Sequence, residues 1–179
     1  MTKKIRTPEI ITYDNHFNDI HTFNLLEEKS QDLFFALIAS IPKIDPCIHN
    51  PVEKKYRLRC KEVCSLGKIM NKKTGFAPQQ LEQRILDINI HVPYIMYITY
   101  PQNGYLDVII TAKLQKLFFV IPENTSTTKF KLDSYIRIKS KYAKALYRLL
   151  LAASNGADHG ICCEPDYELA QKIGTENSD

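Results

Sequence analysis

Residues 78–111 read PQQLEQRILDINIHVPYIMYITYPQNGYLDVIIT, and this stretch decides the fold expected for the chain. Pro78 suits the first turn of a helix. The apolar residues that follow at helical spacing are Leu81, Ile85 and Ile88. Two β-prone runs then flank the tetrapeptide PQNG, in which Asn103-Gly104 is typical of a two-residue hairpin turn. The stretch therefore predicts a helix that leads directly into a β-hairpin.

The residues before this stretch complete a helix-turn-helix. We expect a strand around 55–58 and a small helix over 60–66, which the glycine after it ends. Further upstream, a helix is predicted over 24–41, with Asn24 as its cap and Glu27 closing a capping box. The apolar residues on one face of this helix are Leu26, Leu33, Phe34, Leu37 and Ile41.

After the hairpin the pattern predicts a short helix over 112–120, a brief strand over 129–132 and a long helix over 132–150. A helix-turn-helix followed directly by a hairpin is typical of a winged helix. The fold class expected is therefore α+β: a winged helix with a β-hairpin wing, closed by a long C-terminal helix.

The chain divides into three expected segments. Residues 1–21 carry no periodic pattern and are predicted to form an N-terminal arm, and residues 22–153 form the winged-helix domain. Residues 154–179 are an acidic tail, and its sequence DYELAQKIGTENSD could begin a second, truncated winged helix.

Charge is distributed unevenly along the 179 residues, although the net charge is only +4. Residues 53–73 contain eight lysines and arginines against two acids, and residues 129–148 contain seven against one. The tail has six acids and one lysine. Blocks of opposite sign indicate a basic surface for a polyanion, and a merely solvated face is the alternative.

The closing segment, LDSYIRIKSKYAKALYRLL, combines two stripes on the expected long helix. One is apolar and predicted to face the core: Ile138, Tyr142, Ala145, Leu146, Leu149 and Ala153. The other is basic and lies roughly opposite: Arg137, Lys141, Lys144 and Arg148. Basic side chains on a solvent-facing stripe neutralise DNA phosphates, so we predict that these residues and Lys139 contact DNA.

A second set of DNA contacts is expected around the helix that begins at Pro78. The turn before it supplies Lys72 and Lys73, and the helix itself presents Gln79, Gln83 and Arg84. Acids on the same helix would repel phosphates, so structural packing is the alternative role for this helix.

The closing segment also resembles a family signature. Lys139-Ser140-Lys141-Tyr142, with Leu146-Tyr147 after it, is similar to the pattern that ends the first winged-helix domain of the iteron-binding Rep family of plasmid replication initiators. LLEEKSQDLFFALIASIPK resembles that family's opening helix, and GYLDVIITAKLQKLFF resembles its wing and the helix that follows. The resemblance covers about 25–151.

The resemblance implies a role in starting plasmid replication. Family members bind double-stranded DNA at origin repeats, and their first domain also supplies a self-association surface for homodimers. The host replication initiator and helicase are further partners that the resemblance implies. Family members continue into a second winged helix, which does most of the sequence reading. Alternatives are a dimerisation module with little DNA binding and a stand-alone winged-helix transcription regulator.

The hairpin is the expected dimer surface, because it has more aromatic and apolar area than one sheet face buries. The residues concerned are Tyr94, Met96, Tyr97, Ile98, Tyr100 and Tyr105. Helices that cover both faces of the sheet are the alternative.

No pattern for catalysis or for a bound cofactor is found in the sequence. The glycines form neither a phosphate-binding nor a dinucleotide-binding motif, and no H-E-x-x-H occurs. Cys47, His49, Cys60 and Cys64 have irregular spacing, so we predict that they bind no metal. We expect a binding protein rather than an enzyme, without cofactors.

The location expected is the cytoplasm. The apolar runs are shorter than a membrane span, and the start of the chain lacks the apolar core of a signal peptide. Five cysteines, an odd number, make a poor disulfide framework and fit a reducing compartment.

Overall fold

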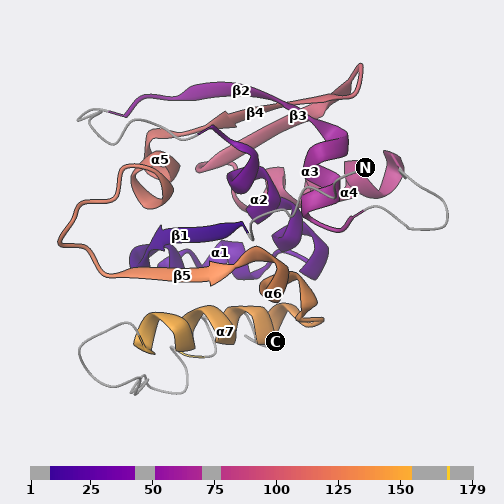
Figure 1. Ribbon diagram of the computed structural model, residues 1–179. Coiled ribbons are helices and arrows are strands. Elements are labelled where there is room, and N and C mark those ends of the chain that lie inside the picture. The colour runs from indigo at the N-terminus through magenta and orange to yellow at the C-terminus, as the bar shows by residue number, and fades with distance from the viewer. Residues whose placement is uncertain (1–8, 43–50, 70–77, 155–168, 170–179) are drawn as a thin grey trace, which may run out of the picture.

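The computed structural model describes residues 9–42, 51–69, 78–154 and 169. Figure 1 shows its layers: a three-stranded sheet at the top, helices beneath it, a two-stranded sheet below these, and one helix at the bottom. In chain order the elements are β1 (Ile10–Asp14), the 3-10 helix η1 (Asn15–Asp19), α1 (His21–Asn24), α2 (Glu28–Ser40), β2 (Lys54–Arg59), α3 (Cys60–Leu66), α4 (Pro78–His91), β3 (Met96–Gln102), β4 (Tyr105–Ile110), α5 (Ala112–Phe118), β5 (Thr127–Lys131), α6 (Leu132–Arg137) and α7 (Lys141–Ser154).

The upper layers form the winged helix. Helix α2 contacts both α3 and α4, and the strands pair antiparallel in the order β2-β4-β3. Asn103 and Gly104 form the turn between β3 and β4, with φ angles of 51° and 80°. Two successive positive φ angles are what a type I′ hairpin turn requires, so the Asn-Gly signal is confirmed. The helices predicted over 60–66 and from Pro78 are also confirmed.

The lower layer consists of β1, β5 and α7. Strand β1 pairs antiparallel with β5, from Ile10 opposite Lys131 to Asp14 opposite Thr127. Tyr13 is fully buried, and Phe17 packs edge-on to it with ring centroids 5.1 Å apart. Residues 10–20 therefore belong to the folded domain, and the arm predicted over 1–21 is wrong for its described part. Strand β1 alternates between buried and more exposed residues, but five residues are too short a pattern to predict a strand whose partner lies more than 100 residues further along the chain.

The first long helix begins later than predicted. Helix α2 starts at Glu28, and Glu27, rather than Asn24, precedes it with extended backbone angles. Asn24 instead ends α1, and its side chain is buried and accepts a hydrogen bond from Arg148. The predicted apolar face is confirmed, since all of its residues are buried: Leu26, Leu33, Phe34, Leu37 and Ile41.

The long closing helix predicted over 132–150 is two helices. Helix α6 ends at Arg137, and Ile138 has extended backbone angles (φ −72°, ψ 123°). Lys139 Nζ donates to the Ile136 carbonyl (3.2 Å), and Ser140 Oγ accepts from the Ala143 N–H (3.4 Å) at the start of α7. Serine at an N-cap starts a new helix, and the break changes which side of the following residues faces inward.

Candidate nucleic-acid interface

Helix α4 has one buried and one exposed face. Leu81, Ile85 and Ile88 are buried. Asn89 fixes the helix to the wing, because its side chain donates to the Ile98 carbonyl (2.7 Å) and accepts from the Ile98 N–H (2.8 Å). The side chains on the opposite face are exposed: Gln79, Gln83, Leu86 and Ile90. The two glutamines therefore lie where the sequence analysis expected them, on a solvent-facing row of α4.

Arg84 lies on a different side of α4. It is only partly exposed, and its guanidinium is close enough to Asp32 and Glu28 to interact with both carboxylates. Burial lowers the pKa of Arg84, while these acids act against that shift. The prediction that Arg84 contacts DNA is therefore not supported by its placement, because the side chain turns toward α2.

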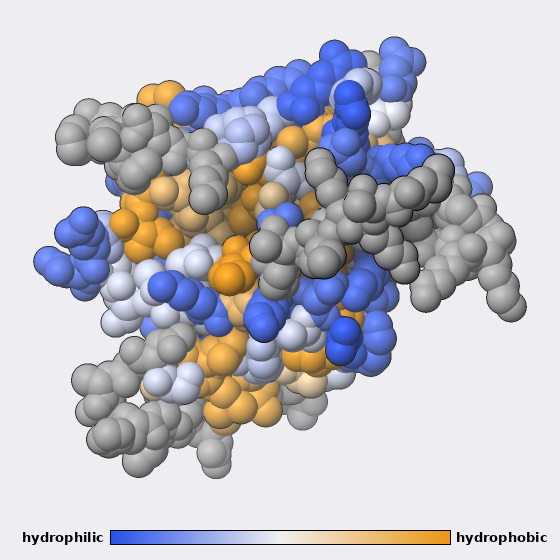
Figure 2. Space-filling view, in the orientation of Figure 1, coloured by the Kyte–Doolittle hydropathy of each residue, from blue (hydrophilic) through white to orange (hydrophobic). Residues whose placement is uncertain are grey.

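A basic row lies on the outer face of the three-stranded sheet. Lys55, Arg57 and Arg59 alternate along β2 and are exposed, with spacing of about 7 Å that follows from the rise of a strand. The hydrophilic band at the top of Figure 2 follows this strand. Arg59 is opposite Tyr105, and the next residue, Cys60, donates its N–H to the Gly104 carbonyl (2.9 Å). The row therefore begins beside the wing turn.

The positive charge of residues 53–73 is evident from the sequence, but these three residues are not among the predicted DNA contacts. Lys55 and Arg57 share Asp107 as ionic partner, at 2.9 and 4.0 Å, and Arg59 is 3.4 Å from Glu62. The available signal was the alternation K-x-R-x-R at strand spacing.

Lys144 of the predicted basic stripe is completely buried, with a side-chain exposure of 0%. Its Nζ pairs with Asp32 of α2, donates to the Glu28 carbonyl (3.1 Å) and lies 4.9 Å from the centre of the Tyr135 ring. Burial lowers the pKa of Lys144, while the Asp32 carboxylate opposes that shift. The side chain holds α7 against α2 and cannot reach a phosphate.

Arg148, one turn further along α7, is also buried, with 2% of its surface exposed. Its guanidinium donates to the Tyr135 hydroxyl (2.7 Å), to Gln31 Oε1 (3.2 Å) and to Asn24 Oδ1. The same group lies 4.6 Å from the centre of the Phe23 ring. Arg148 therefore joins α7 to α1, α2 and α6, and the prediction that it contacts DNA is wrong for this conformation.

The remaining members of the stripe are more accessible. Arg137 is exposed, and Lys139 has 68% of its side chain exposed. Lys141 is partly buried and lies 3.8 Å from Glu27. These three residues can meet a polyanion, whereas Lys72 and Lys73 lie outside the described residues.

The apolar stripe is corrected as well. Tyr142 and Leu146, predicted to face the core, are exposed, while Ala145 and Leu149 are buried. Helix α7 thus turns its charged side inward, since the inner side offers Asp32, Gln31 and Asn24 as partners.

Only part of the predicted dimer surface is available on the hairpin. Met96 and Ile98 are fully buried on the side of the sheet that packs on α4, so they cannot meet a partner. Tyr97 is exposed on the outer face, and Tyr105 is half-buried beneath Arg57, which lies 5.0 Å from its ring centre. The other two predicted residues are Tyr94, whose hydroxyl hydrogen-bonds Thr22 Oγ1 (2.6 Å), and Tyr100, whose side chain is outside the described set.

The described cysteines pack in the core. Cys60 and Cys64 are buried free thiols, and burial raises the pKa of Cys64 to about 11. Cys47 and His49 lie outside the described residues, so the absence of a metal stays a prediction. Among the residues that the structure describes, no group of three or more histidine, cysteine, aspartate or glutamate side chains could hold a metal ion.

Three packed helices, a small sheet whose hairpin forms a wing, and a helix with a polar outward row define a winged-helix protein. The model of the family described as "Initiator Replication protein, WH1" matches residues 10–151. The chain belongs to this family of initiator replication proteins, and the matched residues are its WH1 domain. The resemblance stated from the closing segment is thereby confirmed.

A solved structure has the same fold. The chain is similar to the Pi initiator protein, whose crystal structure is a complex with iteron DNA, with a TM-score of 0.61 and 16% sequence identity. The similarity covers 98% of this chain and 76% of that one. No curated protein matches the sequence. Within the described part of the chain, no helix is both long and apolar enough to span a membrane.

Proposed function

We propose that this initiator starts plasmid replication by binding double-stranded origin DNA with the exposed face of α4, while the wing and Arg59 contact phosphates. The observation that carries the proposal is the exposed row of α4, where Gln79 and Gln83 lie one helical turn apart on the third helix of a winged helix. That helix is the one that enters the major groove in helix-turn-helix proteins.

The chemistry of this row suits base edges. A glutamine amide can donate its N–H to adenine N7 and accept from the adenine N6 amino group, and an aliphatic side chain can contact the thymine methyl group. Leu86 and Ile90 continue the row beyond Gln83 and are exposed. Because they lie on the same face as the two glutamines, they are available for contact with thymine methyl groups.

The phosphate contacts come from basic side chains near the wing. Arg59 is exposed beside the wing turn, and its ion pair with Glu62 is on the surface, where such pairs contribute little. Arg59 can therefore leave its ion pair with Glu62 and bind a DNA phosphate at a small cost in free energy. Each phosphate neutralised releases counterions, so binding should weaken steeply as the salt concentration rises.

The experiment is a salt series of fluorescence anisotropy with two labelled duplexes, a repeat from the plasmid's own origin and a scrambled duplex of equal composition. Gln83→Ala should weaken binding to the repeat by about tenfold, the effect of about 1–3 kcal/mol per base contact, and leave the scrambled duplex nearly unaffected. If Gln83→Ala loses the same factor in affinity for both duplexes, α4 is not the helix that reads the bases.

Arg59→Gln supplies the phosphate arm of the same experiment. It should weaken both duplexes and lower the salt slope by about one, because one phosphate contact is lost. Lys55→Gln is the matched control, since Lys55 lies on the same strand but about 13 Å from Arg59, at the end away from the wing turn. A salt slope that falls only in the Lys55 variant would place the DNA elsewhere on the sheet.

Self-association through the outer face of the sheet is a second proposed property. Tyr97 is the exposed large side chain of β3 on that face, beside half-buried Ile109 of β4. Light scattering over a concentration series should detect a homodimer that Tyr97→Lys weakens. In this proposal the protein acts in the cytoplasm as a binding protein, with no reaction of its own.

A further inference from the structure

Helix α7 buries both charged and apolar side chains, Lys144 and Arg148 beside Ala145 and Leu149, and leaves a second apolar stripe exposed. Its two buried cations face inward, while Tyr142, Leu146 and Leu150 are exposed by 42, 42 and 50% at spacings of four residues. Figure 2 shows the result as a hydrophobic patch over α7 at the bottom of the molecule. No charged side chain of α7 follows Arg148, and none lies between these three residues on the outward side.

An apolar face of this kind is expected to be covered. A second copy is a poor candidate, because stable dimers bury about 1,200–2,000 Å² in total and three side chains per copy on a helix of about 21 Å offer much less. A tethered segment needs no such area, since the tether holds it at an effective concentration in the millimolar range.

The chain supplies such a segment immediately after Ser154. Residues 155–179 contain six acids and one lysine, together with apolar residues. The apolar residues in question are Ile161, Tyr167, Leu169 and Ile173. Leu169, which the structure describes, is helical and partly buried.

The surroundings of α7 carry the opposite charge. Helix α7 contains no acid, and exposed cations lie next to it on both sides. These are Lys129 and Lys131 of β5, and Arg137 and Lys139 at the α6–α7 corner. Opposite charges at the edge of an apolar contact set its orientation and register more than its strength.

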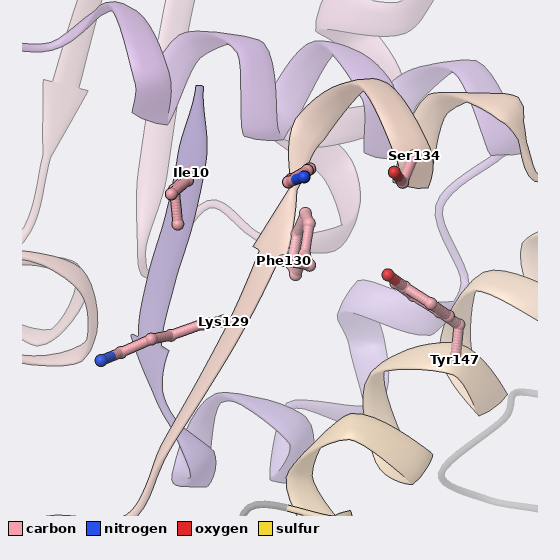
Figure 3. A pocket seen from close by; sticks show the side chains of 6 residues that line it. Ile10, Lys129, Phe130, Ser134 and Tyr147 are labelled. Carbon is pink, nitrogen blue, oxygen red and sulfur yellow. The ribbon is translucent and has the colours of Figure 1, made fainter. Parts of the chain in front are cut away.

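A cavity of about 330 Å³ lies between β1, β5, α6 and α7, and Tyr147 is the residue of α7 that lines it. Figure 3 shows Phe130 and Tyr147 lining it, with the Tyr147 hydroxyl turned toward Ser134. Lys129 and Lys131 also line it. A cavity with an aromatic lining and cationic neighbours suits an apolar side chain flanked by acids.

We infer that residues 161–173 fold back on α7 and cover its outward apolar face. The apolar side chains of this segment lie on Tyr142, Leu146 and Leu150, and its acids, Glu164, Asp166 and Glu168, lie toward the neighbouring lysines. Helix α7 thereby serves as an internal docking surface.

The test is hydrogen–deuterium exchange on the full chain, read by mass spectrometry over peptides from 161–173. Their amides should exchange roughly tenfold or more slowly than those of a synthetic 161–173 peptide, because docking protects them. Leu146→Glu should abolish this protection and leave that of α2 unchanged. Leu86→Glu is the matched control, since Leu86 is exposed to 49% on α4, and it should keep the protection.

Three outcomes would overturn the inference. Amides of 161–173 that exchange as fast as the synthetic peptide would show that nothing covers them. Protection that survives Leu146→Glu would place the segment elsewhere. Protection that disappears on dilution of the wild type would identify a second copy of the chain as the occupant of α7.

Discussion

Helices α4 and α7 are both 14 residues long and amphipathic, yet α4 buries only apolar side chains while α7 buries two cations among its apolar ones. Helix α4 buries only apolar side chains, such as Ile85, although Leu86 is exposed on the same face as Gln83. Helix α7 buries Lys144 and exposes Leu146. The difference teaches that periodicity locates two stripes on a helix, but the partners available across the interface decide which of them faces inward.

The buried cations of α7 have several polar partners. The Asp32 carboxylate forms an ion pair with Lys144. The Tyr135 hydroxyl and the Gln31 amide oxygen accept hydrogen bonds from Arg148. The Tyr135 hydroxyl also donates to Gln31 (2.6 Å), which links α6 to the same cluster. Burying a charge is costly unless it is paired and hydrogen-bonded. Lys144 meets that condition through Asp32, whereas Arg148 has only neutral acceptors and its buried Nε has no hydrogen-bond partner.

The largest effect is expected when this cluster is broken. Asp32→Asn should destabilise the fold by about 3–5 kcal/mol, because it leaves Lys144 buried without its counter-charge. Urea unfolding followed by circular dichroism measures the change. The double variant Asp32→Leu with Lys144→Met should recover most of the loss, since both charges are then absent. A loss below about 1 kcal/mol in the single variant would mean that Lys144 is solvated.

The second prediction compares the loss in free energy of unfolding when an apolar side chain is shortened on each of the two helices. Ile85→Ala in α4 should cost about 2–5 kcal/mol because it leaves a cavity in the core. Leu146→Ala in α7 should cost about 1 kcal/mol or less, because an exposed side chain contributes little to the free energy of unfolding. Thermal melting of both variants makes the comparison. Equal losses would mean that Leu146 is a core residue, as the hydrophobic pattern alone indicates.

The next effect appears at alkaline pH. Burial raises the pKa of Tyr135, so the folded state keeps this proton while the unfolded state loses it above pH about 10. The stability that Tyr135 contributes is therefore fully present below that pH and is lost as the pH rises further. Burial also raises the pKa of Tyr13 to about 12, which adds to the same loss.

The variant Tyr135→Phe isolates this contribution. The free energy of unfolding of the wild type should fall as the pH rises above about 10, and that of the variant should fall less steeply, as measured by urea titration at each pH. Identical slopes would show that the Tyr135 hydroxyl is open to solvent rather than enclosed beside Arg148.

Most of the winged helix could be predicted from local patterns. The Asn103-Gly104 turn, the helical spacing after Pro78 and the apolar face of α2 are local signals, and each led to the correct element. Strand β1 could not be predicted in this way, because it is stabilised by β5 across the length of the domain. The break at Ile138–Ser140 was missed because the helical pattern continues through it with only a change of phase.

The candidate site was less predictable than the fold. Gln79 and Gln83 were placed correctly, since α4 is an ordinary amphipathic helix. Lys144 and Arg148 were misplaced because a cation on a helix normally faces water. Their partners Asp32, Gln31 and Asn24 precede them by more than 100 residues, and no local pattern connects the two segments.

The inward orientation of the charges on α7 is tested most directly by native-state acetylation of lysines, quantified by mass spectrometry on peptides from the intact, folded protein. Lys139, with 68% of its side chain exposed, should be acetylated rapidly. Lys144, with none of its side chain exposed, should react only after the protein is unfolded in urea. Acetylation of Lys144 at the rate of Lys139 in the folded protein would contradict the burial of the charged side of α7.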